Sequence, residues 1–186
     1  MPPRQIHDLQ QTMIYDYPVP DKEQVIVRRL PWDYRGGDNY QVVMDMECDP
    51  EELFDAMLDF EIQAETSHVI DWVKIIEKTD ECIKLEMAML PEIHPGKFLY
   101  KYYPERENLR IHWWCYGVEG AGDKQVWESI DVVAHIYPFG KFSRAIFTEN
   151  FTYCKGQLTP DATPIFAGVG NDIINRVKER RKRGRK

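Results

Sequence analysis

Two glutamates draw attention because each falls on the apolar phase of a predicted β-strand. In residues 126–136, one alternating phase holds Glu128 among Val, Ile and Ala residues. In residues 145–153, one phase holds Glu149 among Ala, Phe and Tyr residues. Because successive side chains of a strand point to opposite faces, we expect each carboxylate to face the same side as its apolar neighbours.

The turn between these two strands sets their register. If it pairs Tyr137 near Phe142, Glu128 lies opposite Phe151. The two glutamates are then diagonal neighbours on one face, about 7 to 8 Å apart at the backbone. Burial and mutual repulsion would raise the pKa of at least one carboxyl, which suits it to donate or accept a proton near neutral pH. An aldol-type cyclase or dehydratase would use such an acid–base pair.

Simpler arrangements of the same residues remain open. A one-residue slip or a β-bulge would turn Glu128 or Glu149 into solvent. Alternatively, Arg110 would neutralise one of them. Under any of these arrangements the pair would not act as acid and base.

Other candidates for chemistry are fewer. His112 and His135 lie on predicted strands in the phase opposite the core, which is typical of surface or edge residues, and His94 sits in a proline-flanked loop at a possible cavity mouth. The sequence contains no HExxH, GxSxG, P-loop or GxGxxG spacing, which argues against common metalloprotease, hydrolase and nucleotide-binding classes. The four cysteines form no CxxC pair, which indicates buried thiols rather than zinc ligands or disulfides. We therefore expect no metal and no cofactor.

The surrounding elements follow from periodicity and turn residues. Residues 1–39 are predicted to be an irregular extension with one possible strand at 24–29. A strand from Tyr40 then leads to a helix, with Asp49 as cap, Pro50 in its first position and Glu52 completing a capping box. Six further strands are predicted at 69–78, 83–89, 98–102, 109–116, 124–137 and 142–153. Short spacings and tight turns favour an antiparallel meander.

A long helix is predicted at the end of the chain. Thr163 is expected to cap it and Pro164 to occupy its first position, with apolar residues at helical spacing up to Val177. Gly168 and Gly170 within it indicate a close approach to the sheet, a kink, or room for a ligand. A later helix start, near residue 171, is the alternative.

The segment Met44–Asp59 resembles the START-like (SRPBCC) superfamily of polyketide cyclases, lipid-transfer domains and pollen-allergen-like proteins, in which a strand ends in a polar-Pro-Glu helix start. The resemblance covers about residues 40–180 and implies an α+β helix-grip domain, at 40–183. Its curved antiparallel sheet of about six to seven strands would wrap around a long C-terminal helix. Two features depart from the pattern: the extension at 1–39 and the loop at 91–96. Members of the superfamily are too diverse for one activity to be carried over.

The resemblance also implies a cavity between the sheet and the last helix that holds a small apolar or amphipathic molecule, lipid-like or polyketide-like. Strand phase and the apolar stripe of the last helix give its expected ligand-binding lining, Met87, Tyr100, Tyr102, Trp113, Phe147, Phe151 and Phe166. A cyclase that uses Glu128 and Glu149 is the alternative function. A cavity-free interaction module with a filled core is the third.

Charge is divided unevenly along the chain. The segment Arg176–Lys186 holds eight basic residues and one acid, whereas the whole chain has a net charge of −7. Such a tail suggests contact with an anionic surface, either membrane lipid or nucleic acid, although a solvated helix end without a partner has the same composition. The start of the chain lacks a signal-peptide pattern and no apolar run spans a bilayer, which predicts a cytoplasmic protein. The sequence does not define an oligomeric state.

Overall fold

The computed structural model describes residues 17–30, 37–92, 94–154 and 161–184. Its strands are β1 (Gln24–Arg29), β2 (Asp38–Met46), β3 (Ile70–Lys78), β4 (Ile83–Met89), β5 (Lys97–Glu105), β6 (Arg110–Glu119), β7 (Trp127–Phe139) and β8 (Phe142–Tyr153). Its helices are α2 (Pro50–Met57), α3 (Gln63–Thr66), α4 (Thr163–Lys182) and two 3₁₀ turns, η1 (Arg106–Asn108) and η2 (Gly122–Lys124).

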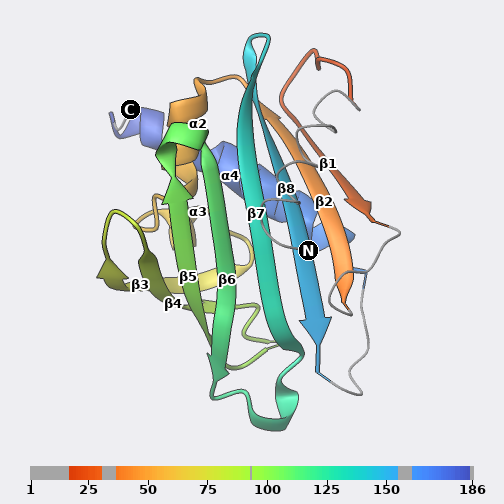
Figure 1. Cartoon of the computed structure of the whole chain (residues 1–186), viewed down its shortest axis with the longest axis vertical. Coiled ribbons are helices and arrows are strands. Elements are labelled where there is room, and N and C mark those ends of the chain that lie inside the picture. The colour runs from red at the N-terminus through yellow and green to blue at the C-terminus, as the bar shows by residue number, and fades with distance from the viewer. Residues whose placement is uncertain (1–16, 31–36, 93, 155–160, 185–186) are drawn as a thin grey trace.

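All eight strands form one antiparallel sheet in the order β1-β2-β8-β7-β6-β5-β4-β3. α4 crosses behind the long central strands, with α2 and α3 beside its C-terminal half (Figure 1). The predicted helix-grip architecture is confirmed. The sheet is slightly wider than expected, because β1, predicted only as a possible strand of an irregular extension, pairs along its whole length with β2.

The two predicted helix starts are confirmed, but their caps differ from expectation. α2 begins at Pro50, where the missing N–H costs no hydrogen bond, yet the Asp49 side chain makes no capping bond. α4 begins at Thr163, one residue before the predicted start. Its N-cap is Ala162, and the Asp161 carboxylate accepts the Thr163 N–H at 3.0 Å.

Two glycines allow α4 to lie close to its neighbours. A Cβ at Gly170 would stand 2.6 Å from a methyl group of Val25 on β1, and a Cβ at Gly168 would stand 2.0 Å from the imidazole of His68. Of the three explanations open at the sequence level, close approach is therefore the one that these contacts support.

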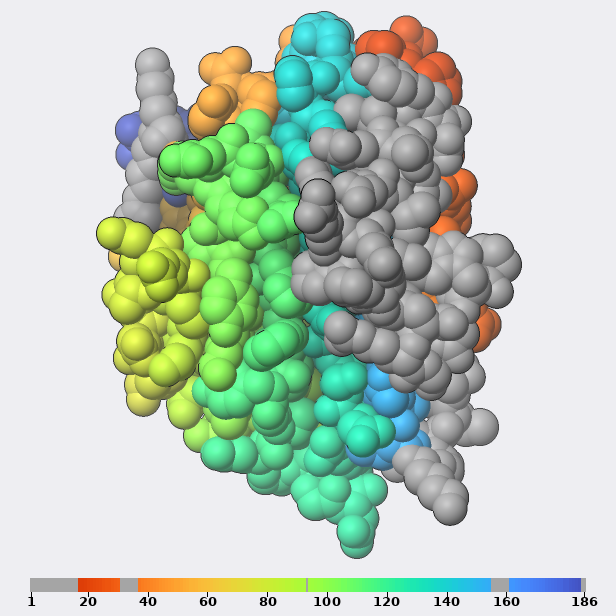
Figure 2. Space-filling view, in the orientation of Figure 1, coloured from red at the N-terminus to blue at the C-terminus, as the bar shows by residue number. Residues whose placement is uncertain are grey.

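Each face of the sheet carries its own apolar cluster. The main core lies on the inner face, between the sheet and the helices. Its buried residues come from β2 and from β4 to β8 as well as the helices, and partly buried residues of β1 and β3 pack against it. A smaller cluster lies on the outer face and consists of Val43, Tyr137, Phe139 and Ile146, with Tyr17 and Ile26 packed against it. Figure 2 views the molecule from this outer side, and of α4 only the C-terminal end is visible there. No helix within the described part of the chain is long and apolar enough to cross a membrane.

The β7–β8 hairpin is tighter than expected. Phe139 pairs with Phe142, so the connection has two residues, and Gly140 supplies the positive φ of 68° that such a turn requires. Pro138 remains in the strand opposite Ser143. The predicted register was therefore wrong by two residues, and Val132 lies opposite Glu149.

Candidate functional site

A cavity of about 140 Å³ lies between the inner face of the sheet and α4. Its walls come from the central strands, the end of β4, one residue each of α2 and α3, the α3–β3 connection and the first four turns of α4. Apolar and aromatic side chains make up most of the lining, and a few polar groups interrupt it. The polar groups with most chemical consequence are Gln63, Tyr100, Tyr102, Glu149, Asp172 and Arg176.

The seven residues expected to bind a ligand all line this cavity: Met87, Tyr100, Tyr102, Trp113, Phe147, Phe151 and Phe166. Tyr102 stacks on Trp113 with ring centroids 5.4 Å apart, and Phe151 lies 5.1 Å from Phe166. Six of these residues come from strands, and Phe166 comes from α4. That these residues bind a ligand stays a prediction.

Trp127 also lines the cavity, although its predicted phase placed it on the outer face. A β-bulge between Trp127 and Ser129 is the reason, because it shifts the strand by one residue. The shift turns Trp127 inward and leaves Glu128 exposed. The predicted acid pair is therefore absent, since Glu128 faces solvent while Glu149 is buried.

Glu149 and Asp172 are both buried acids of the cavity lining, and Glu149 is the one whose carboxyl has no bonded partner among the described residues. Glu149 is only 7% exposed, and burial raises the pKa of its carboxyl to about 8. No hydrogen bond or ion pair joins its carboxyl to any residue within the described ranges. Arg110, named above as the alternative partner of a buried glutamate, bonds instead to Glu105. At neutral pH Glu149 is therefore mainly protonated and available as a hydrogen-bond donor.

The two tyrosines of β5 contribute polar tips on the same wall. Burial raises the pKa of both Tyr100 and Tyr102 above the ordinary value, so both hydroxyls stay protonated. The Glu149 carboxyl acts electrostatically on both of them, and Arg176 acts on Tyr102. These side chains thus form one polar region in an otherwise apolar cavity.

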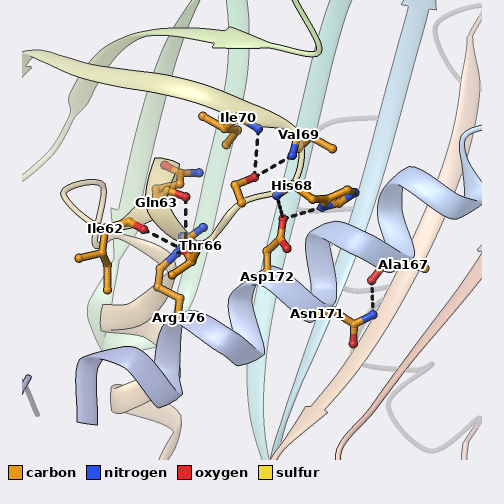
Figure 3. Close-up of polar contacts among 11 residues, drawn as sticks. Ile62, Gln63, Thr66, His68, Val69, Ile70, Ala167, Asn171, Asp172 and Arg176 are labelled. Atoms are coloured by element: carbon orange, nitrogen blue, oxygen red, sulfur yellow. Dashed lines mark hydrogen bonds and ion pairs between the residues drawn. The ribbon is translucent and has the colours of Figure 1, made fainter. Parts of the chain in front are cut away.

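Arg176 is the buried cation of the cavity. Its Nε donates to the Thr66 hydroxyl at 3.3 Å (Figure 3). Its Nη1 donates to the Ala56 carbonyl, also at 3.3 Å. Burial lowers the pKa of its guanidinium to about 10. Nearby, Gln63 is 8% exposed, and its Oε1 has no hydrogen-bond donor within the described part of the chain.

Asp172, one helical turn before Arg176, is already engaged. Its Oδ2 accepts the His68 backbone N–H at 2.8 Å and lies 2.7 Å from His68 Nδ1. These contacts tie the α3–β3 connection to α4, as Figure 3 shows. Sequence reasoning missed Gln63, His68, Asp172 and Arg176. Asp172 and Arg176 did leave a signal, because they are polar residues four apart that interrupt the apolar stripe of the helix.

The histidines named from the sequence are not brought together. His112 is half-buried and lies 2.7 Å from Asp131. His135 is buried and stacks on Tyr137, which corrects its expected surface position, because the outer apolar cluster covers this part of the sheet. His94 does not line the cavity. It is fully buried between Phe98 and Trp127, and burial lowers its pKa.

The basic segment forms the last turns of α4 as far as Lys182. Arg176 and Arg180 are buried, and Arg181 holds Glu52 with two hydrogen bonds of 2.6 and 2.8 Å. The other described bases bond to acids too: Lys178 to Glu23, Arg180 to Asp59, Lys182 to Glu179, and Arg183 to Glu65 and Glu179. Within the described residues, most of this charge is thus used to fix α4. The described residues also include no group of three or more His, Cys, Asp and Glu placed to hold a metal ion.

Comparison with solved structures identifies the fold. No protein-family model matches the sequence, and no curated protein is significantly similar to it. Among solved structures, the chain is similar to the Zhui aromatase/cyclase from Streptomyces sp. R1128, with 10% identity, a TM-score of 0.62, and coverage of 83% of this chain and 96% of that one. It is also similar to a START superfamily protein from Mycobacterium smegmatis, with 12% identity, a TM-score of 0.57, and coverage of 83% and 97%. Ara h 8.0201 matches at 12% identity and a TM-score of 0.55, covering 77% and 99%. The chain therefore has a START-like fold.

Proposed function

We propose that this protein binds a small apolar or amphipathic molecule in the cavity between its sheet and α4. The observation that carries the proposal is the cavity itself, which stands in the middle of an otherwise close-packed core. A few polar groups on an apolar wall are typical of a ligand site, where they orient the molecule while the wall supplies affinity.

The polar groups strengthen this proposal because they lack partners within the described chain. The Glu149 carboxyl has no hydrogen bond there, and the Gln63 Oε1 has no donor. Buried polar atoms are usually satisfied, so unsatisfied ones at a cavity wall favour a ligand that completes them. A lipid-like or polyketide-like ligand, the finer expectation from the fold, would need the cavity to widen.

Native mass spectrometry of freshly purified protein, with solvent extraction of what is released, tests the proposal. We expect a reproducible excess mass that disappears on denaturation and yields an extractable organic molecule. Because a weakly bound molecule escapes this measurement, binding of small aromatic probes by calorimetry provides the second test. A bare mass together with no probe binding would overturn the proposal.

A proton-transfer enzyme of the cyclase or dehydratase type is a second candidate, and Glu149 is the observation that favours it. A carboxylic acid that is mainly protonated at neutral pH can donate a proton to a bound substrate. Glu149 would act alone in this reaction, since Glu128 is exposed. Glu149→Gln should then abolish turnover and leave ligand binding in place, whereas full turnover by that variant would exclude the assignment.

A further inference from the structure

The size of the cavity limits what it holds. A cavity of 150 Å³ lined by apolar residues accommodates benzene, and the volume here is about 140 Å³. A molecule with one six-membered ring therefore fits without rearrangement. A long acyl chain or a fused-ring molecule would have to displace core side chains, which costs free energy in a close-packed interior.

The shape and chemistry of the walls favour a flat aromatic ring. Aromatic side chains surround the cavity on several sides: Tyr100, Tyr102, Trp113, Trp127, Phe147, Phe151, Tyr153 and Phe166. Several already meet edge to face, such as Trp113 with Phe147 at 77° and Trp127 with Phe151 at 61°. A further ring can join such a cluster through the same offset and edge contacts, which are worth more than burial of the same area of aliphatic surface.

The charge of the cavity favours an acid. Arg176 is 3% exposed, and no carboxylate bonds to it among the residues the structure describes. The two acids that act on it electrostatically bind other groups, Asp172 holding His68 and Asp59 holding Arg180. A buried cation without a bonded counter-ion is costly, so an anionic oxygen from a ligand would be strongly favoured beside it.

Glu149 cannot supply that counter-charge at neutral pH. Burial keeps its carboxyl mainly protonated, so it offers a hydrogen-bond donor rather than a negative charge. Tyr100 and Tyr102 likewise offer neutral hydroxyls. The cavity lining also includes the Asp172 carboxylate, but His68 already binds it. The remaining polar groups are one cation and neutral hydrogen-bonding groups, which are the complement of a single anionic oxygen group.

From size, wall and charge together, we propose that the ligand is a single-ring aromatic acid whose anionic oxygens lie beside Arg176. This inference rests on the proposed function, because it names the chemical class that the same cavity selects. Benzoate is the simplest probe of that class.

Calorimetric titration at pH 7 with four probes tests the inference. Toluene replaces the carboxylate of benzoate with a methyl group, benzylamine reverses the charge, and palmitate replaces the ring with a long chain. We expect benzoate to bind at least tenfold more tightly than toluene, and benzylamine and palmitate to show no measurable binding.

The probes also separate the two proposals. Toluene or palmitate binding at least as tightly as benzoate would overturn the aromatic-acid inference and leave the binding function standing. If none of the four binds and native mass spectrometry gives a bare mass, the binding function itself fails.

Variants of Arg176 test whether this residue is responsible for the preference for benzoate over toluene. Arg176→Met should bring benzoate affinity down to that of toluene, while toluene affinity stays unchanged. Since Arg176 also bonds to Thr66 and Ala56, its loss can disturb folding, and toluene binding reports whether the cavity is intact. Arg176→Lys, which keeps the charge, should retain most of the preference for benzoate over toluene. An unchanged preference in Arg176→Met would overturn the inference.

A pH series gives a readout that a purely structural role of Arg176 would not move. Benzoate affinity should fall as pH rises through about 8, because Glu149 then becomes a competing anion. The other ionisable groups facing this region are Tyr40 on β2, opposite Glu149, Tyr100 and Tyr102 on β5, and Asp172 on α4. Glu149→Gln should remove the fall. A fall of equal size in that variant would contradict the arrangement.

Discussion

A buried arginine on the outer face of the sheet is bonded to a carboxylate, whereas a buried arginine on the inner face is bonded to none among the described residues. On the outer face, Arg144 is completely buried and fully bonded. Its Nε and Nη2 donate to the Asp45 carboxylate at 2.7 and 2.9 Å, and its Nη1 and Nη2 donate to the Tyr17 and Pro18 carbonyls. The guanidinium also lies 3.8 Å from the centre of the Phe139 ring.

On the inner face, buried Arg176 and Glu149 have no such partners. Arg176 makes two hydrogen bonds of 3.3 Å to neutral oxygens, and Glu149 makes none within the described chain. Buried polar groups that are fully paired stabilise one arrangement, whereas unpaired ones lower stability unless something else binds them. The comparison suggests that the outer cluster maintains the fold and the inner groups serve a ligand.

The largest expected effect comes from breaking the outer cluster. Asp45→Ala would leave the Arg144 charge buried without its carboxylate and should lower the free energy of unfolding by about 3 to 5 kcal/mol. Glu47→Gln is the control, because Glu47 and its partner Lys141 are exposed and such a pair contributes less than about 1 kcal/mol. Urea unfolding at pH 7 measures both, and equal losses would show that burial of the outer pair is unimportant.

The next largest effect should come from replacing Glu149, which should raise the free energy of unfolding rather than lower it. Burial raises its pKa from 4.5 to about 8, so the folded protein holds a proton that the unfolded chain releases as pH rises. Stability from this group is therefore fully present below pH 4.5 and is lost as pH rises towards 8. Glu149→Gln avoids that loss and should be more stable than the native protein by roughly 2 to 4 kcal/mol at pH 8, with little difference at pH 4.5.

Glu128→Gln provides the matched control for that pH series. Because Glu128 is exposed at the bulge, its replacement should change the free energy of unfolding by less than about 0.5 kcal/mol at either pH. A pH-dependent change of similar size in both variants would mean that Glu149 is not the buried acid.

The smallest effect should come from alanine substitutions at the two glycines that let α4 lie close to its neighbours, a position that places Arg176 at the cavity. At Gly170, an added methyl group meets the branched side chain of Val25 on β1, and Gly170→Ala should cost about 1 to 3 kcal/mol. At Gly168 the methyl group meets the half-exposed ring of His68, which can rotate towards solvent at the cost of its contact with Asp172, whereas Val25 is held in the sheet. Thermal unfolding of the two variants should therefore show the larger loss for Gly170→Ala.

Several parts of the site could be predicted from the sequence because they depend on local pattern. Alternation in 145–153 placed Glu149 among inward apolar residues. Alternation in the strands also placed six of the seven expected wall residues at the cavity, and helical spacing placed the seventh, Phe166. The regular spacing of α4 and its proline gave the helix. In each case the property belongs to one element, so neighbours along the chain were enough.

Other parts could not be predicted because they depend on pairing between elements. The position of Glu128 followed from one bulge, which a single sequence does not reveal. The bonds of the basic segment depend on acids more than 50 residues earlier, Asp59 and Glu52 among them. His68 reaches Asp172 across 104 positions.

By itself, the sequence determined the order and type of the elements and the apolar identity of the inner wall. These rest on propensity and on the periods of two and 3.6 residues, which act over a few neighbouring positions. The START-like fold was expected from the resemblance of Met44–Asp59 to a known superfamily. Only the tertiary structure decided that Glu149 is buried without a bonded partner among the described residues, that Arg176 shares its cavity, and that a cavity of about 140 Å³ lies between the sheet and α4. Burial and unpaired charge are properties of the space enclosed by distant segments, and no local pattern specifies that space.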